Sequence, residues 1–286
     1  MPTSISTVPP QWLALIALYA ESLRAIGRPP TTIGLRKAQL SQMARALGCP
    51  PSEVTEDHIL WWFGSKVWEK ETRRSYRSAV RGFFAYLYEH GDIESDPAAK
   101  LKPIAIDTPQ PRPAPDYAWD IAMRDATARV DLMARLAGEA GLRRGEVARV
   151  RTEDLDYSGA GPRLLVHGKG AKDRLIPVST TLADRIRAGA AGHTPGAPAK
   201  GWLFPTVRLT GDHLSPAAVG DLVSEVLPDG WTMHTLRHRF ATRAYRATRN
   251  LRAVQILLGH ASIATTQRYL AVDDDEMRAA MLGAAA

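Results

Sequence analysis

Two stretches near the C-terminus decide the fold: HTLRHRFAT at residues 234–242 and LLGHASIATTQRYL at residues 257–270. The first stretch has helical spacing, and on a helix residues three apart project from the same face. His234 and Arg237 can therefore converge on one ligand. A planar, permanently charged guanidinium suits two phosphate oxygens at once. The pattern indicates a site for an anion, most simply a phosphate.

A zinc site is the alternative for the same stretch. His238 stands four residues after His234, which is the spacing of a helical zinc pair. No HExxH pattern accompanies the pair, and no third ligand is obvious. The one cysteine, Cys49, excludes both an internal disulfide and a multi-cysteine metal site. We therefore expect no metal and no other cofactor.

The charge distribution also favours an anionic partner. The 286 residues include 37 Lys and Arg against 30 Asp and Glu, which gives a formal net charge of +7. Residues 231–272 hold seven arginines and no acidic residue, and the acidic run DDDE at 273–276 follows them. Positive charge gathered in one window is typical of proteins that bind polyanions.

A second set of cations recurs every three or four residues and would follow one face of a helix. Such a stripe can track a phosphate backbone. The set consists of Lys66, Lys70, Arg73, Arg77 and Arg81, with Arg74 beside it. The alternative is a solvated helix face that Glu69 and Glu71 partly neutralise, and the charge pattern alone leaves both interpretations open.

Membrane insertion is not expected. The longest apolar run, residues 12–20, is nine residues long, whereas a bilayer span needs about 20. Arg24 is the first cationic side chain, so no basic segment precedes that run as it would in a signal peptide. We expect a soluble, cytoplasmic protein.

A proline-rich stretch divides the chain. Residues 102–115 hold five prolines, and proline fixes φ and removes amide donors, so this stretch should be a semi-extended linker. We predict an N-terminal helical domain over 1–103, a linker over 104–115, and a second domain over 116–286 that ends in a C-terminal tail. Helical spacing at 10–27, 32–47, 55–65 and 71–90 makes the first domain a small bundle.

The second domain is predicted to be mainly helical with a small antiparallel sheet. Two short β-prone runs, LLVH at 164–167 and LIPV at 175–178, flank the polar connector GKGAKD. This pattern describes a β-hairpin, and Pro177 suggests that its second strand lies at a sheet edge or carries a bulge there.

Four motifs in order resemble the tyrosine recombinases, the phage integrase and Xer group. They are AGLRRGEV at 140–147, HGKGAKDRLIPV at 167–178, and the two stretches quoted first. Residues 73–102 are similar to the last helix and exit of that family's DNA-binding domain, so the resemblance covers nearly the whole chain. It implies a two-domain, C-shaped clamp around double-stranded DNA.

Position by position, the resemblance implies six catalytic residues. Arg143 and Arg237 would clamp the scissile phosphate, and His260 would hydrogen-bond it. Tyr269 would attack phosphorus to form a 3′-phosphotyrosyl enzyme. His234 would assist proton transfer at the tyrosine, and Lys169 would protonate the leaving 5′-oxygen. Lys172 and Arg239 would contact DNA, as would the cationic stripe at 66–81.

Each of these residues has a plainer alternative. Arg143 could pair with Glu146 or Glu139 near a helix end, and Lys172 competes with Lys169 for the role of general acid. Tyr245 is the alternative phenol, but it falls inside the helix expected after His234.

The resemblance implies a homo-tetramer on paired DNA sites that exchanges strands through a Holliday junction, monomeric off DNA. A second recombinase or a directionality factor is left open. Two other functions compete: relaxation of supercoils by a type IB topoisomerase-like activity, and DNA binding without catalysis. The filled catalytic positions disfavour the second of these.

Overall fold

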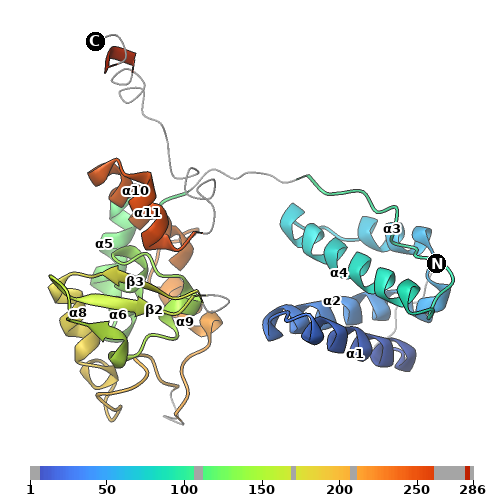
Figure 1. Cartoon of the computed structure of the whole chain (residues 1–286), viewed down its shortest axis with the longest axis horizontal. Helices are drawn as coiled ribbons and strands as arrows, with labels where there is room; N and C mark the ends of the chain where they lie inside the picture. The colour runs from blue at the N-terminus through green and yellow to red at the C-terminus, as the bar shows by residue number, and fades with distance from the viewer. Residues whose placement is uncertain (1–6, 106–111, 169–171, 207–210, 261–280, 284–286) are drawn as a thin grey trace. The chain divides into compact units, whose positions relative to one another are not determined.

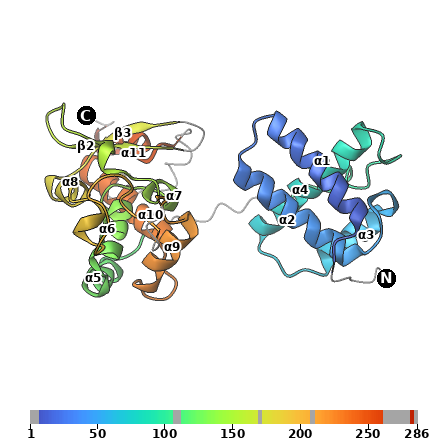
Figure 2. The same ribbon diagram turned by 90° about the horizontal axis from the view of Figure 1, so that it is seen from below.

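The computed structural model describes residues 7–105, 112–168, 172–206, 211–260 and 281–283. The chain divides into two units, Met1–Thr108 and Pro109–Ala286, so the division falls inside the proline-rich stretch. Both units are built mainly from helices, and the second contains a small antiparallel sheet (Figures 1 and 2). The predicted fold class is confirmed. The arrangement of the units as a C-shaped clamp stays a prediction.

The first unit is the expected helical bundle. Its elements are α1 (Pro10–Ala25), α2 (Pro30–Leu47), the short 3-10 helix η1 (Pro51–Glu53), α3 (Glu56–Gly64) and α4 (Lys70–Glu89). Proline opens α1 and α2, where its missing amide costs no hydrogen bond. Gly48 ends α2 with φ of 70°, a conformation that glycine adopts without strain. The predicted helix ranges match these bounds within a few residues.

Aromatic side chains fill the core of this bundle. Trp12 of α1 is fully buried and stacks on Phe83 of α4, with ring centroids 5.5 Å apart. Its indole nitrogen donates to the carbonyl of Cys49, so its one polar group is satisfied. Burial of each such side chain contributes roughly 1.5–3 kcal/mol. The core thus holds α4, the helix with the cationic stripe, against α1 and α2.

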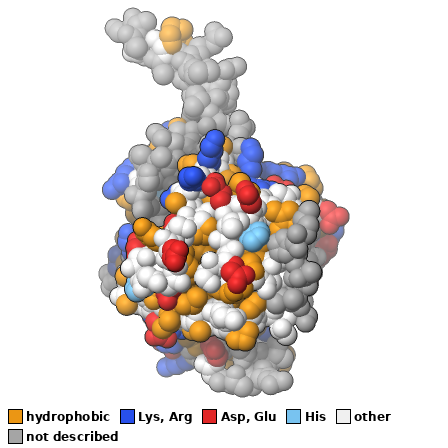
Figure 3. Space-filling view, turned by 90° about the vertical axis from the view of Figure 1, so that its right-hand side faces the viewer, with side chains coloured by type: hydrophobic (Ala, Val, Ile, Leu, Met, Phe, Trp, Pro, Cys, Tyr) orange, Lys and Arg blue, Asp and Glu red, His pale blue; other side chains and the backbone are white. Residues whose placement is uncertain are grey.

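Figure 3 presents one face of the first unit. Hydrophobic side chains are mixed there with single acidic residues, and Lys and Arg gather toward the upper edge of the face. On the face shown, the basic side chains are therefore concentrated at one edge.

The second unit surrounds one hydrophobic core with helices and a three-stranded sheet. Its helices are α5 (Asp116–Asp125), α6 (Ala128–Gly138), α7 (Arg144–Val147), α8 (Thr180–Arg187), α9 (Pro216–Glu225), α10 (Met233–Thr248) and α11 (Leu251–Leu258), with 3-10 turns η2 (Thr152–Asp154) and η3 (Ala190–Gly192). The buried α6 packs against α10, which carries the first quoted motif.

The predicted hairpin is present as β2 (Arg163–Val166) and β3 (Arg174–Pro177). Leu164 pairs with Ile176, and both are buried in the core. A third strand, β1 (Leu155–Asp156), pairs with β2 and leaves β3 at the edge, where Pro177 is tolerated. The sequence did not predict β1, because two residues are too few to show an alternating pattern.

The turn between α10 and α11 places a non-glycine residue, Arg249, in the left-handed conformation, with φ of 53°. The next residue, Asn250, caps α11, where its side-chain oxygen accepts a hydrogen bond from the Ala253 amide at 2.9 Å. Asparagine is among the best N-cap residues, and its capping bond stabilises the helix by about 1 kcal/mol.

Candidate active site

A buried carboxylate, Glu146 of α7, lies at the centre of the candidate site. Its oxygens accept hydrogen bonds from the Arg143 amide at 2.8 Å and from the Arg143 guanidinium at 2.9 Å. Arg174 of β3 binds it with two further bonds, at 2.8 and 3.0 Å. Burial would raise the pKa of Glu146, but these bonds and the nearby Arg237 lower it to about 2. The carboxylate is therefore ionised at neutral pH.

The carboxyl end of α11 holds the same three arginines. The Leu258 carbonyl accepts hydrogen bonds from Arg237 at 2.7 Å and from Arg143 at 3.3 Å. The Leu257 carbonyl accepts one from Arg174 at 2.9 Å. These carbonyls have no partner within the helix and lie at the negative end of its dipole, so they attract cations.

Gly259 is required at the end of α11. It adopts a left-handed conformation, with φ of 63°, and a Cβ atom there would lie 2.9 Å from the Arg174 guanidinium. A larger residue would strain the backbone and push this arginine away from Glu146. The glycine of the LGH motif thus has a packing reason.

Arg237 of α10 is almost completely buried, with 1% of its surface exposed. Besides Leu258 it donates to the carbonyl of Gly141, and one guanidinium nitrogen lies 3.1 Å from Nε2 of His260. Its Nη1 atom lies 3.6 Å from Oε2 of Glu146. The second arginine of the proposed phosphate clamp therefore contacts four groups within the described part of the chain, whereas the Arg143 side chain is 44% exposed.

The contact with Arg237 fixes the protonation of His260. A guanidinium only donates hydrogen bonds, so Nε2 of His260 must accept. Burial and the positive charges of Arg237 and Arg143 lower the pKa of His260 to about 4, so the ring is neutral near pH 7. The single proton of the neutral ring then lies on Nδ1, from which the ring can donate to an anion.

His234 lies near the amino end of α10 and belongs to the same charged environment. Desolvation, Arg237 and Arg143 lower its pKa, in that order of size. Its Nε2 atom lies 2.9 Å from Nε2 of His238, one helical turn away. The structure thus brings together four of the six predicted catalytic residues. The other two, Lys169 and Tyr269, lie outside the described residues.

The base of the hairpin that carries Lys169 is held by His167, which directly follows β2. One ring nitrogen lies 2.8 Å from the buried Asp154, and the other lies 3.1 Å from Asp173 on the opposite arm. The bond with Asp154 is the main cause that raises the pKa of His167. Lys172, the competitor of Lys169, is exposed on the same hairpin.

Arg239, predicted to contact DNA, is engaged inside its own unit. It is 8% exposed, and its guanidinium lies 2.7 Å from Asp116 and 4.8 Å from the ring centre of Trp119. These contacts fasten α10 to α5. A role for Arg239 at DNA stays a prediction.

The predicted cationic stripe lies on α4 except for Lys66, which precedes the helix, and its side chains are of two kinds. Arg73 donates to the carbonyls of Phe63 and Lys66, both at 2.9 Å, and Arg77 donates to that of Leu101. These two arginines hold the loop after α3 and the segment after α4. The other members are exposed or half-buried and consist of Lys66, Lys70, Arg74 and Arg81. Arg74 pairs with Glu71 at 2.5 Å, as the solvated-face alternative anticipated.

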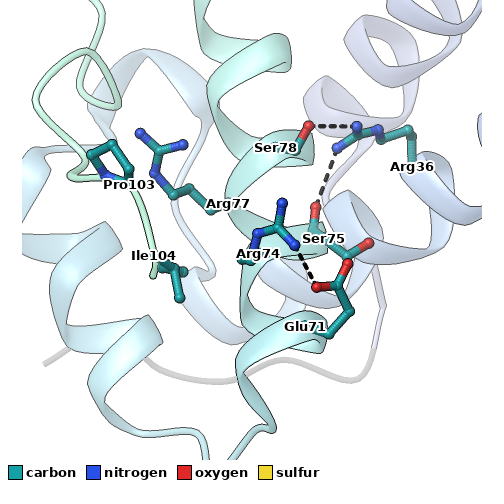
Figure 4. A pocket seen from close by; sticks show the side chains of 8 residues that line it. All are labelled: Arg36, Glu71, Arg74, Ser75, Arg77, Ser78, Pro103 and Ile104. Carbon is teal, nitrogen blue, oxygen red and sulfur yellow. Dashed lines mark hydrogen bonds and ion pairs between the residues drawn. The ribbon is translucent and has the colours of Figure 1, made fainter. Parts of the chain in front are cut away.

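A pocket beside α4 adds a cation that the sequence pattern did not reveal. Arg36 of α2 donates to the Ser75 carbonyl at 3.2 Å and to the Ser78 hydroxyl at 2.6 Å, next to Arg74 and Arg77 (Figure 4). The lining is completed by Glu71, Pro103 and Ile104. No periodic signal in the sequence could link Arg36 to α4, because the two helices are joined only by the fold.

Two negative findings apply to the described part of the chain. Within the described residues, no group of three His, Cys, Asp or Glu side chains is arranged to hold a metal ion. Over those same residues, no helix has both the length and the apolar character of a membrane span.

Comparison with known proteins identifies the family. Residues 118–276 match the model of the phage integrase family. The chain belongs to that family. A tyrosine recombinase XerC from Azotobacter vinelandii is 36% identical over 213 residues, which cover 71% of this chain and 70% of the relative. The chain is a tyrosine-type site-specific recombinase, as its four motifs predicted.

Solved structures share the fold of this integrase. A λ integrase dimer bound to a COC′ core site has a TM-score of 0.71 and 19% identity, over 92% of this chain and 77% of that one. A λ integrase tetramer bound to a Holliday junction has a TM-score of 0.68 and 19% identity, over 87% and 77%. At this identity the likeness shows the architecture of both units.

Proposed function

We propose that this integrase cuts and rejoins DNA strands at a specific duplex site through a 3′-phosphotyrosyl intermediate. The observation that carries the proposal is the convergence of Arg143, Arg237 and His260 at one point, from three motifs spread over 118 residues of sequence. Two guanidinium groups and a neutral imidazole N–H form a set of donors for the oxygens of one phosphate.

The transition state of the proposed reaction explains this set. When a nucleophile attacks phosphorus, negative charge builds on the non-bridging oxygens. Arg143 and Arg237 would offset that charge, and Nδ1–H of His260 would donate to one of those oxygens. Prepositioned donors of this type stabilise transition states by several kcal/mol because they need no reorganisation during the reaction.

Three side chains would move the protons and form the covalent bond. The Tyr269 oxygen attacks phosphorus while its proton passes to His234, and the bond from phosphorus to the 5′-oxygen breaks. Lys169 gives its proton to that leaving oxygen. The phosphotyrosyl ester conserves the bond energy, and attack by a new 5′-hydroxyl reverses each step. The reaction therefore needs neither metal nor nucleotide.

The first unit would supply phosphate contacts outside the reaction centre. Support comes from the pocket of Figure 4, where Arg36, Arg74 and Arg77 border one hollow together with the Ser78 hydroxyl. Guanidinium and hydroxyl groups are common partners of the DNA backbone. Lys70 and Arg81 extend the cationic surface along α4.

For assembly, the λ integrase tetramer on a Holliday junction is the guide. We propose that this chain also acts as a homo-tetramer on two DNA sites, in the cytoplasm, with a second recombinase as an alternative partner. The test of assembly is the mass of the complex on a synthetic four-way junction. A complex of one or two protomers would contradict it.

The decisive experiment identifies both the nucleophile and the DNA site. Protein is incubated with randomised duplexes that carry a nick, covalent complexes are isolated under denaturing conditions, and the trapped DNA is sequenced. We expect one enriched sequence, and no trapping by Tyr269→Phe. Trapping that persists in Tyr269→Phe but is lost in Tyr245→Phe would reassign the nucleophile. Relaxation of any supercoiled plasmid, whatever its sequence, would favour a topoisomerase-like activity.

A further inference from the structure

Arg174, the first residue of β3, joins two elements of the candidate site that are distant in sequence. Its two terminal nitrogens donate to the two oxygens of Glu146 on α7, at 2.8 and 3.0 Å, and its Nε donates to the Leu257 carbonyl at the end of α11, at 2.9 Å. The Arg174 side chain is only 11% exposed, and that of Glu146 only 4%. All three guanidinium nitrogens of Arg174 thus bind inside the protein.

The Arg143 guanidinium spans the same two elements, but with one nitrogen. Its Nη1 donates to Oε1 of Glu146 at 2.9 Å and to the Leu258 carbonyl at 3.3 Å. Within the described part of the chain, its Nη2 and Nε have no hydrogen-bond partner, and the side chain is 44% exposed. The proposed phosphate contact needs such N–H groups, because a guanidinium binds two phosphate oxygens through two nitrogens.

The acceptor sites of Glu146 are filled by these two arginines. Oε1 accepts from Nη1 of Arg143 and from Nη1 of Arg174, and Oε2 accepts from the Arg143 amide and from Nη2 of Arg174. An ionised carboxylate has about four acceptor sites, so no site is left for a second guanidinium nitrogen of Arg143. Without Arg174, two sites of a buried carboxylate would be open, and a nearby cation would turn to fill them because an uncompensated buried charge is costly.

Arg143 is the cation that would fill those sites. Both terminal nitrogens of Arg237 donate to backbone carbonyls, and Nη1 of Arg237 lies 3.6 Å from the carboxylate. Arg143 is already bonded to Glu146 and has two further nitrogens to offer. Burial raises the pKa of Glu146, and the bonds from Arg174 are the largest cause that opposes this effect. Loss of Arg174 would therefore leave Glu146 short of partners.

We propose that Arg174 is a positioning residue of the phosphate clamp, which fills two acceptor sites of Glu146 and thereby leaves Nε and Nη2 of Arg143 available to the scissile phosphate. The inference rests on the proposed function, because it specifies how Arg143 performs its part there. Gly259 contributes to the same arrangement, since a Cβ atom at this position would lie 2.9 Å from the Arg174 guanidinium.

Chemical modification of the full chain tests the position of Arg143 without DNA. Phenylglyoxal reacts with accessible guanidinium groups, and tandem mass spectrometry distinguishes Arg143 from the exposed Arg144, which serves as the internal reference. In Arg174→Met, Arg143 should turn toward Glu146 and react about threefold more slowly, relative to Arg144, than in the wild type. A loosened fold would instead make Arg143 react faster, so an unchanged or faster reaction would overturn the proposal.

Cleavage kinetics on the DNA site found by trapping test the consequence, at a temperature below the melting point of each variant. Arg174→Met should lower kcat by roughly tenfold, part of the effect of one transition-state donor, with KM for DNA nearly unchanged. In Glu146→Gln, a neutral amide no longer attracts Arg143, so the added Arg174→Met substitution should change kcat by less than about twofold. An equal loss of kcat in both backgrounds would refute a role through Glu146.

Arg163→Met is the matched control. Arg163 lies at the opposite end of the β2–β3 pair from Arg174, and it pairs with Asp156. Its replacement removes an ion pair from the same sheet but leaves the bonds of Glu146 in place. We expect wild-type values both for kcat and for the reactivity of Arg143. Slower reaction of Arg143 in this variant too would show that any damage to the sheet moves it, and would overturn the specific role of Arg174.

The two proposals fail in distinguishable ways. Wild-type kcat in Arg174→Met would refute the inference alone, because covalent trapping would still support the recombinase chemistry. Absence of any trapping by the wild-type protein would instead refute the proposed function, while the reactivity of Arg143 remains measurable.

Discussion

Removing the charge of Glu146 should lower the free energy of unfolding of the second unit. The size of this loss can be derived from the lowered pKa of the carboxylate. Glu146→Gln keeps the shape of the side chain but leaves Arg174 and Arg237 buried without their counterion. The pKa of Glu146 falls from 4.5 to about 2, and each tenfold change in proton affinity corresponds to about 1.4 kcal/mol. The ionised carboxylate therefore stabilises the folded state by about 3 kcal/mol near pH 7.

The sign of the pH dependence follows from the direction of this change. Because the pKa is lower in the folded state, the stabilisation is complete above about pH 4.5 and is lost as the pH falls toward 2. At about pH 3 the difference between wild type and Glu146→Gln should be less than half of its value at neutral pH.

Calorimetry of the full chain measures the effect. For a unit of this size a loss of 3 kcal/mol lowers the melting temperature by roughly 6–12 °C. The transition of the first unit should not move. Glu225→Gln, at an exposed position of α9, serves as the control and should change the stability by less than about 0.5 kcal/mol. A loss below about 1 kcal/mol in Glu146→Gln, or a loss that stays constant down to about pH 3, would refute the reasoning.

Three further outcomes are expected. Tyr269→Phe should form no covalent complex with a nicked site, as seen by the absence of a protein–DNA band in a denaturing gel. Replacing Lys70 and Arg81 by alanine should weaken binding to DNA of any sequence. The slope of log K against log salt concentration should become shallower by about 0.9 for each phosphate that is no longer neutralised. An unchanged slope would contradict the prediction that α4 faces DNA. The pKa of His167 is raised, mainly by its bond with Asp154. The protonated ring therefore stabilises the folded state below about pH 6.5, and this contribution disappears as the pH rises through the pKa of the folded state. In urea unfolding, His167→Gln should therefore be less stable than wild type at about pH 6 and nearly as stable at about pH 9. The difference at pH 6 should be under about 1 kcal/mol, because the ring is more than one-third exposed. A difference that does not change with pH would contradict this account.

The helices and the hairpin could be predicted because their signals are local. Apolar residues spaced three and four apart define a helix face within one segment, and the GKGAKD connector marks a turn between two short strands. The order of the four motifs predicted the family for the same reason, since each motif is contiguous. Local signals fail for β1, which is only two residues long, and for Arg249, a residue type that seldom takes a positive φ.

The contacts between motifs could not be predicted, because they join segments that are distant in sequence. Arg73 and Arg77 have the spacing of a DNA-binding stripe, yet the fold directs both toward backbone carbonyls. For this reason Arg81 is a better probe of DNA binding than Arg73 or Arg77, since its exposed side chain takes no part in those two backbone contacts. The pairing of Arg143 with Glu146, considered as a plainer alternative to catalysis, is present together with the contact to Leu258.

The position of Glu146 also corrects a simple electrostatic expectation. Residues 231–272 lack acidic side chains, and an acidic residue beside the phosphate clamp would be expected to oppose it. The fold nevertheless places Glu146 among Arg143, Arg174 and Arg237. Three cations and one carboxylate leave a local charge of +2, which still exceeds the single charge of a phosphodiester. Without the carboxylate, three neighbouring guanidinium groups would repel one another at a buried position. Glu146 thus reduces the electrostatic repulsion among the three arginines in the absence of DNA, and the remaining positive charge still attracts the phosphate.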